Sequence, residues 1–457
     1  MQERGGYILH VDGTCEEGSG VLLVCLDSLS GQVLESRKIG SENHGEVTTV
    51  LQDVRRDWGL PLAIVHDLRH SLITAVGQVF PHRPQFVCHY HLAADIGKDI
   101  LGAPVDRLRR LFRRTKVRPK LRALCRALKP FAAPAGGDSV LDTVLGLTSP
   151  QRLRQAATPE TVQGIVQALA SWILAFTHQG DGYGFPFDVP YLSLYERIRQ
   201  VHQLLEETLA QGGVKSRGPW SPLRRLKDIL DLVVSRRYAA EFRAIVAETK
   251  RDQAIFQRLR NALRICPKGG GHGRKDKGTV RALSAARHQA VLRTLRQALQ
   301  RQARRPTAPR ACQIVVQHLD KYWPLLFGHV LRKPVGTIVV PRTNNVEESL
   351  FRTVKRQCRR LHGRGHLCRD LEEMFEATPL LLNLRNPGYC EIVFGGAEPQ
   401  RIAERFSLVD PNLPRQLLKR WRREKLCVRL PRKFERLPKL PQRLTRFIRA
   451  AFKKLQK

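Results

Sequence analysis

The segment YILHVDGT, at residues 7–14, has the composition of a buried β-strand and carries an aspartate, Asp12, near its end. Two further strand-like segments follow after Gly-containing turns, GVLLVCLDS at 20–28 and GQVLESRKI at 31–39. Beyond them, helical spacing alternates with short apolar runs, which predicts helix 46–57, strand 62–66, helix 68–80, strand 85–88 and helix 92–100. This order of strands and helices predicts a mixed α/β fold.

The character of the chain changes after residue 100. From residue 105 to about residue 322, nearly every segment has helical spacing and is rich in Leu, Arg, Gln and Ala. Two more helices are expected at 346–361 and 371–384, and a tail dense in Lys and Arg begins at residue 415. We therefore expect a long all-helical region after the first α/β segment, and a basic C-terminal arm.

Charge and composition limit the function classes that fit this chain. It has 457 residues, with 79 Lys and Arg against 41 Asp and Glu, which gives a formal charge of +38. Hydrophobic residues make up 42%, enough for a folded core, and no run approaches the roughly 20 apolar residues that span a bilayer. The ten cysteines follow no regular spacing, which favours reduced intracellular thiols. A chain this basic is expected to bind a phosphate backbone, so the predicted partner is nucleic acid and no membrane partner is expected.

Three acidic positions are distinguished by where they fall. Asp12 lies within the first strand, Asp67 directly follows a later strand, and Glu347 and Glu348 stand at the start of the helix expected at 346–361. Carboxylates on neighbouring strand ends and on a helix can hold two Mg²⁺ or Mn²⁺ ions about 4 Å apart, an arrangement that promotes phosphodiester transfer. Each acid also has an ordinary interpretation as a turn or capping residue, and the residues alone leave both interpretations open.

Four segments carry a resemblance to a known family. They are HVDGT (10–14), VHDLRHSLITAVGQVFP (65–81), FVCHYH (86–91) and RTNNVEESLFRTVKRQCRRLHGR (342–364). In this order they resemble DDE transposases with a ribonuclease-H-like catalytic domain, and in particular bacterial insertion-sequence transposases related to the Mutator-like group. In that family the first strand carries the first Asp, which matches Asp12. The second Asp precedes a helix ending in Phe-Pro, which matches Asp67.

The later motifs extend the match. The family's Cys-x-x-His signature matches Cys88 and His91, and its Thr-Asn-Asn segment, here with Asn344 and Asn345, leads to the metal-binding Glu. The resemblance spans residues 7 to about 390 and implies a ribonuclease-H-like mixed sheet interrupted by a large all-helical insertion. The implied domains are a first part of the core at 1–104, a helical insertion at 105–335, a second part of the core at 336–398 and a basic C-terminal arm at 399–457.

Helix geometry bears on which glutamate is the metal ligand. At 100° per residue, Glu348 shares a stripe with three basic residues that can hold phosphates, Arg352, Lys355 and Arg359. Glu347 falls on an apolar stripe that is expected to pack on the sheet, with Leu350, Phe351, Val354, Cys358 and Leu361. Glu347 also stands three residues after Asn344, as in a capping box. We therefore expect Glu348 to be the ligand and retain Glu347 as the alternative acid.

The remaining signature residues are given structural roles. Cys88 and His91 suggest zinc by their spacing, but zinc needs about four ligands, and no second close pair of Cys and His is nearby. The resemblance implies that they form a structural junction between strand and helix. Asn344 and Asn345 are expected to cap the following helix, with orientation of the catalytic carboxylate as the alternative role.

Together these features predict a transposase that cleaves DNA at the ends of a mobile element and transfers the strands into target DNA. Asp12, Asp67 and Glu348 would hold two Mg²⁺ (or Mn²⁺) ions. The expected partners are transposon-end and target DNA and further copies of the chain, in the cytoplasm and associated with the nucleoid. Because such enzymes generally carry a DNA-recognition domain before the first strand, which here begins by Tyr7, two alternatives stay open. One is a catalytically silent or N-terminally truncated transposase-derived DNA-binding protein, and the other is a structure-selective nuclease of the same fold.

Overall fold

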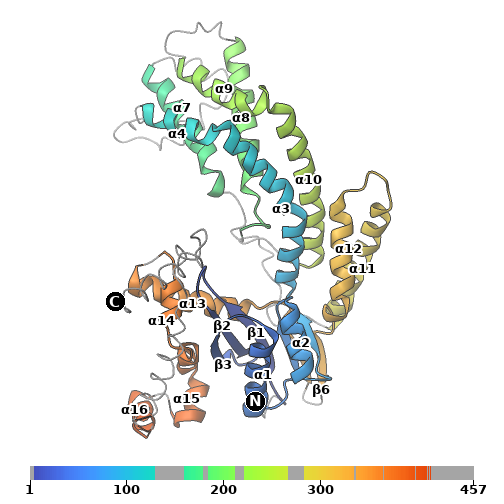
Figure 1. The fold of residues 1–457 in the computed structure, drawn as a ribbon, viewed down its shortest axis with the longest axis vertical. Helices are drawn as coiled ribbons and strands as arrows, with labels where there is room; N and C mark the ends of the chain where they lie inside the picture. Colours follow the sequence, from blue (N-terminus) through green and yellow to red (C-terminus); the bar gives the residue numbers. More distant parts are fainter. Residues whose placement is uncertain are drawn as a thin grey trace, which may run out of the picture.

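The core of the protein is a five-stranded mixed sheet in the order β3-β2-β1-β4-β5 (Figure 1). The computed structural model describes residues 5–128, 159–178, 184–211, 221–265, 282–333, 336–363, 365–396, 398–408, 410 and 412. The strands of this sheet are β1 (Ile8–Thr14), β2 (Val21–Asp27), β3 (Gln32–Ile39), β4 (Ala63–His66) and β5 (Gln85–Val87). The mixed α/β fold expected from the sequence is confirmed.

The strand directions bring two acids to one end of the sheet. β2 is antiparallel to both β1 and β3, whereas β4 is parallel to both β1 and β5. In the β1–β4 pair, Val11 lies opposite His66. Asp12 follows Val11, and Asp67 follows His66. Because neighbouring parallel strands end at the same edge of a sheet, these two acids lie side by side there.

The two faces of the sheet are covered by different helices. Helices α1 (His44–Trp58) and α2 (His70–Val79) pack on the face that carries Leu9 and Val11. Helix α13 (Asn345–His362) packs on the opposite face against Val24 and other β2 and β3 side chains. Since side chains alternate along a strand, Asp12 shares the α13 face. The alternation of side chains along β1 therefore places Asp12 on the face of the sheet that α13 covers.

A long helical insertion separates β5 from α13. Its helices are α3 (His89–Thr115), α4 (Val117–Ala127), α7 (Pro159–Leu174), η2 (Ala175–His178), α8 (Pro190–Gln211), α9 (Ser221–Val234), α10 (Ala239–Ala262), α11 (Ala282–Ala303), α12 (Arg310–Tyr322) and η3 (Trp323–Leu325). The helical character expected up to residue 322 is confirmed for the described residues. α3 rises from the sheet and α10 runs beside it, while α11 packs against α10 and α12 packs against both α3 and α10 (Figure 1). The expected boundary between residues 104 and 105 falls inside α3, which runs unbroken from the core into the insertion.

The chain then returns to the core through a short hairpin that sequence analysis did not predict. It consists of β6 (Val330–Lys333) and β7 (Gly336–Val339), and it precedes α13. After α13 come α14 (Cys368–Glu373), η4 (Thr378–Arg385), α15 (Pro387–Phe394) and α16 (Pro399–Ser407). The single helix expected at 371–384 is wrong, because α14 ends at Glu373 and Pro379 cannot continue a helical hydrogen-bond ladder from the residues before it. Most of the basic arm expected at 399–457 lies outside the described residues.

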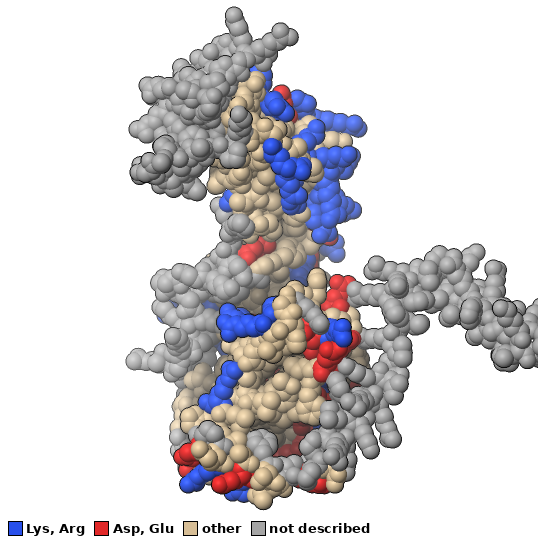
Figure 2. All heavy atoms as spheres, turned by 90° about the vertical axis from the view of Figure 1, so that its left-hand side faces the viewer, with Lys and Arg blue, Asp and Glu red and all other residues tan. Residues whose placement is uncertain are grey.

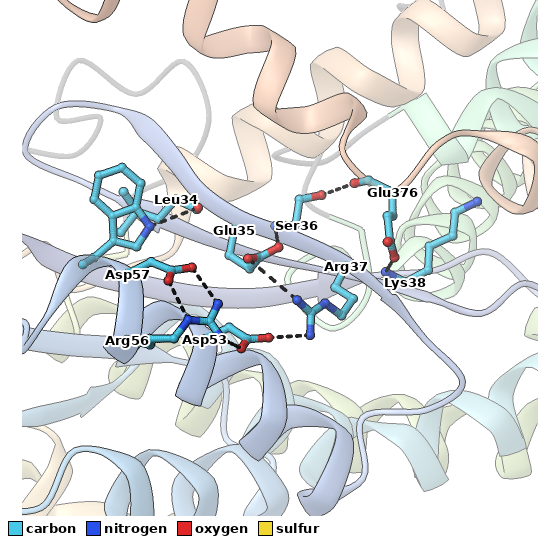
Figure 3. A network of polar contacts seen from close by, with 10 residues as sticks. Leu34, Glu35, Ser36, Arg37, Lys38, Asp53, Arg56, Asp57 and Glu376 are labelled. Atoms are coloured by element: carbon cyan, nitrogen blue, oxygen red, sulfur yellow. Dashed lines mark hydrogen bonds and ion pairs between the residues drawn. The ribbon is translucent and has the colours of Figure 1, made fainter. Parts of the chain in front are cut away.

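The outer strand β3 is bonded on its free edge by the segment that follows α14. The Asn383 side chain makes two hydrogen bonds with the backbone of Val33. Its Oδ1 accepts from the Val33 N–H, and its Nδ2 donates to the Val33 carbonyl, both at 2.8 Å. Further along the strand, Ser36 donates to the carbonyl of Glu376, and the backbone N–H of Lys38 donates to the Glu376 carboxylate at 3.2 Å (Figure 3). These contacts occupy backbone groups that an exposed edge strand would otherwise present to another chain.

Charged side chains form ion pairs where helix α1 packs against strand β3. Arg37 reaches Asp53 of α1 at 2.7 Å, and Arg56 contacts both Asp53 at 2.5 Å and Asp57 at 2.7 Å (Figure 3). The pair between Arg37 and Asp53 links β3 to α1, whereas Arg56 pairs with Asp53 and Asp57 within α1 itself.

Two further properties concern the described residues only. None of the helices in the described ranges is both long and apolar enough to cross a membrane. Their eight cysteines are all free thiols.

Asn383→Ala is expected to loosen the outer edge of the sheet. The substitution leaves a buried N–H and a buried carbonyl of Val33 without partners, at a cost on the order of 1–3 kcal/mol. Amide hydrogen exchange of residues 32–39 should become faster. Asn261→Ala is the matched control, because Asn261 is exposed and bonds only Gln257 through its side chain. Equal exchange in β3 for both variants would contradict the role assigned to Asn383.

Candidate active site

Asp12 and Asp67 form the base of the candidate site. The Asp12 side chain lies on the α13 face of the sheet, and the residue is 8% exposed. Its Oδ1 accepts a hydrogen bond from the backbone N–H of Gly13 at 2.8 Å. Asp67 follows β4 and accepts from the backbone N–H of Leu68 at 2.6 Å. Both carboxylates are thus held by the backbone of the residue that follows them.

His91 lies between Asp67 and the third acid, Glu348. It lies in the first turn of α3, directly after β5. Its Nδ1 is 3.5 Å from Asp67 Oδ1, and its Nε2 is 4.0 Å from Glu348 Oε1. Asp67 and Glu348 are 281 residues apart in the sequence, yet they contact the two nitrogens of one imidazole ring. The structure therefore gathers Asp12, Asp67 and Glu348 around His91, which sequence reasoning had given only a structural role.

The charges in this cluster shift one another's titration. The pKa of Asp12 is raised to about 6, chiefly by burial and with a contribution from Asp67, while His91, Gly13 and Asn344 oppose the rise. Burial by itself lowers the pKa of His91, but its neighbours Cys88, Asp67 and Asp12 outweigh that effect and raise this pKa well above 6.5.

Glu347 is the most unusual group in the region. It is fully buried on the sheet side of α13, and neither carboxylate oxygen has a hydrogen-bond partner among the described residues. Burial, and after it the nearby Asp12 and Cys88, raise the pKa of Glu347 well above 4.5. The capping box expected between Glu347 and Asn344 is wrong, because the Glu347 carboxylate turns into the core.

The apolar stripe predicted for α13 is confirmed in its first turns. Glu347, Leu350, Phe351 and Val354 are all buried against the sheet. The expectation fails at the far end of the helix, where Leu361 is 77% exposed because α13 has run past the sheet.

The Asn residues before α13 do not act as side-chain caps. Asn344 occupies the N-cap position, but its side chain caps no backbone N–H of the helix, so the capping role expected for it is wrong. The buried amide lies beside His10 and Asp12 instead. Asn345 is already the first residue of the helix, so it is not a cap either.

Cys88 links the strand end to the same segment. Its thiol accepts from the backbone N–H of Asn344 at 3.3 Å, and the N–H of His89 donates to the carbonyl of Arg342 at 2.9 Å. These contacts join β5 to the start of α13. They agree with the predicted junction between strand and helix.

The basic stripe of α13 faces outward as predicted. Arg352 and Arg359 are exposed, and Lys355 is partly buried. Lys355 contacts Glu16 at 3.1 Å, so it bridges α13 to the loop between β1 and β2. Arg352 and Arg359 are accessible to a ligand, whereas Lys355 has an acidic partner.

A fourth partner of the site, Glu42, was missed by sequence reasoning. Its carboxylate lies against the backbone of Gly13, where a Cβ atom would overlap it. Arg69 forms an ion pair with Glu42 and also approaches Asp67, with its Nε 3.8 Å from Asp67 Oδ2. Burial raises the pKa of Glu42, and Arg69 opposes the rise. Glu42 lies in a loop before α1, and no motif in the sequence distinguishes it from a solvated acid.

Behind the site, buried histidines and an arginine join the insertion to the core. Arg342 donates to the carbonyl of Leu263 at 3.1 Å and lies 3.3 Å from His288 Nδ1. His89 bonds the carbonyl of Leu326 at 3.0 Å, and the His329 ring stacks on Phe86. Burial lowers the pKa of His329 to about 3.

The site contains the oxygen donors that a divalent cation requires, although it is not arranged as a ligand set. Within the described ranges, no group of three or more His, Cys, Asp and Glu side chains is placed so that it could hold a metal ion. Asp67, Glu348 and Glu42 contact His91 or Arg69 instead. The arrangement can concentrate carboxylates at a partly open end of the sheet, beside exposed arginines.

Glu347→Gln is expected to gain stability over the wild type as the pH rises. A carboxyl whose pKa is raised by folding weakens the folded state progressively above its ordinary pKa of about 4.5. The gain should reach the order of 1–3 kcal/mol at neutral pH. Urea unfolding midpoints measured in EDTA across this pH range test it. Glu348→Gln, at a partly exposed neighbour, should change stability by less than about 1 kcal/mol. Parallel pH profiles for wild type and Glu347→Gln would contradict the burial of an unpaired carboxyl.

Comparison of the chain with protein-family models and with curated proteins returned no match. The description of the site therefore depends on the geometry given above.

Proposed function

We propose that the chain is a DDE transposase, which cleaves phosphodiester bonds at the ends of a mobile DNA element and joins the freed ends to target DNA. The observation that carries this proposal is the meeting of Asp12, Asp67 and Glu348 around His91. The three acids come from a strand, a strand end and a helix, as the resemblance to this family implies. Their separation in the sequence makes a chance grouping of turn residues a poor explanation.

The architecture supports a ribonuclease-H-like core as part of this proposal. The five-stranded mixed sheet carries the first two acids on neighbouring parallel strands. A helical insertion follows β5, and α13 then returns to the sheet with the third acid. Each of these features is implied by the resemblance.

The residues present suit Mg²⁺ or Mn²⁺ in their chemistry. Asp12, Asp67 and Glu348 offer only oxygen donors, which hard cations prefer. The Glu347 carboxyl group, which has no hydrogen-bond partner among the described residues, is a further oxygen donor near Asp12. In this proposal Asp12, Asp67 and Glu348 would hold two ions, which when bound activate the attacking oxygen and stabilise the leaving one. Glu347 remains the alternative to Glu348.

The other side chains position the substrate and the acids. Arg352 and Arg359 are exposed on the same stripe as Glu348 and would hold DNA phosphates beside it. His91 orients Asp67 and Glu348 relative to each other. In the reaction, water attacks phosphorus, the bond to the 3′ oxygen breaks, and a 3′-hydroxyl is left. That hydroxyl then attacks a target phosphodiester, so one phosphorus–oxygen bond forms as another breaks.

The proposed partners follow from this reaction. Joining two ends of one element requires two active sites, so the enzyme would act as a homo-oligomer on transposon-end and target DNA. The net charge of +38 supports a DNA partner. In a bacterial cell such an enzyme would act in the cytoplasm at the nucleoid.

A catalytically silent DNA-binding protein is the second candidate. It is favoured by one observation, that no described group of acids is arranged as a metal site. A nuclease of the same fold that does not join strands is distinguished from both by its products.

Glu348→Gln is expected to abolish cleavage and strand joining. The assay uses the full-length protein, DNA with the genomic sequences that flank its coding region, and Mg²⁺ or Mn²⁺. Loss of the carboxylate should lower the rate more than about 100-fold, the upper end of the cost of losing a supporting residue at a metal site. Glu347→Gln is the matched control and should retain cleavage.

The products separate the candidates. Joined donor and target strands support a transposase, and cleavage without joining indicates a nuclease. Metal-independent binding without cleavage by any version would indicate the silent protein. Loss of activity only in Glu347→Gln would reverse the assignment of the third ligand.

A further inference from the structure

A dense basic surface lies on the helical insertion, at a distance from the candidate active site. Residues 106–126, at the end of α3 and along α4, contain ten Lys or Arg and one acid, Asp106. We refer to these residues as the α3–α4 tract, whose formal charge is +9. For comparison, α11 carries four Arg and no acid in 22 residues. Figure 2 shows Lys and Arg side chains gathered along one edge of the helical part, with few acidic side chains among them.

Most basic side chains of the α3–α4 tract form no ion pair with another described residue. Arg107 and Arg114 pair with acids of α10, and Arg109 pairs with Asp106. Six further basic residues are exposed and have no acidic partner among the described residues; they are Arg110, Arg113, Lys116, Lys120, Arg122 and Arg126. Like charges placed this densely repel one another, so the surface favours a polyanion that spans it.

The tract has a fixed relation to the site because one helix carries both. His91 lies in the first turn of α3, and Arg107 follows 16 residues later in the same helix. At 1.5 Å per residue, the tract therefore begins about 24 Å from the site. α3 is held along its length by α10, with Gly97 pressed against Pro186 and Phe256. The tract is thus held at a set distance from the acids.

We propose that the α3–α4 tract binds the backbone of the DNA duplex that flanks the cleaved phosphodiester. This inference rests on the proposed function for the position of the cleaved bond. With a rise of 3.4 Å per base pair, contact begins about seven base pairs from that bond. A duplex fits better than a compact ligand, because the charged side chains are distributed along two successive helices and do not converge on one point.

The first test measures DNA binding without catalysis. The triple variant Arg110→Gln/Arg113→Gln/Arg122→Gln is compared with Arg287→Gln/Arg293→Gln/Arg301→Gln, which removes three exposed arginines from α11. Binding of a duplex of about 30 base pairs is measured in EDTA over a range of salt concentrations. The tract variant should lower the slope of log K against log salt by about 2 to 3 and weaken low-salt binding at least about tenfold, whereas the α11 variant should leave both unchanged.

The second test places the contact. In the cleavage assay with Mg²⁺, shortening the flanking duplex to less than about seven base pairs should slow the wild type to the rate of the tract variant. The tract variant should show no further loss on the short substrate. Equal salt slopes for the tract and α11 variants would overturn the proposal, as would an equal loss of binding to polyglutamate, which indicates an acidic protein partner. A wild type that binds with the expected slope but never cleaves would refute the proposed function and leave the tract as a DNA-binding surface.

Discussion

Negative charge at one end of the sheet is the constraint on which the rest of this structure depends. Five carboxylates collect there, on Asp12, Glu42, Asp67, Glu347 and Glu348. Like charges at these separations repel by several kcal/mol when water is excluded. Two basic side chains, His91 and Arg69, lie among these acids and offset the repulsion, and burial raises the pKa of Glu347.

The long insertion does not disturb this arrangement, because hydrogen bonds join its two ends where they meet the core. The start of α3 and the segment before α13 share a hydrogen bond from the N–H of His89 to the carbonyl of Arg342. The Cys88 thiol adds a contact to the backbone of Asn344. Closing a loop of this length costs entropy that grows only slowly with the number of residues. The acids of β1 and α13 can therefore be brought together although the chain between them forms a separate helical body.

Helix α3, whose start is held at the core by these hydrogen bonds, has two roles. Its first turn places His91 between Asp67 and Glu348, and its far end presents the basic tract. A rigid helix shared by the acids and the charged surface keeps their spacing constant. The buried layer of Arg342, His89 and His288 fixes the helix where it leaves the sheet, and burial lowers the pKa of His89 well below its usual value.

Sequence reasoning missed the β6–β7 hairpin. It predicted the five strands of the main sheet, most of the helices, Asp12 and Asp67 at neighbouring strand ends, and the buried stripe that begins at Glu347. These follow from short-range periodicity, which records which side of a strand or helix meets the core. Only the tertiary structure decided that His91 joins two acids, that Asn344 lies beside Asp12 without capping α13, and that Glu42 approaches Gly13. Those contacts link segments far apart in the chain, and no local pattern encodes them. Their residues look the same in sequence whether they face water or one another, because packing alone sets the distance between them.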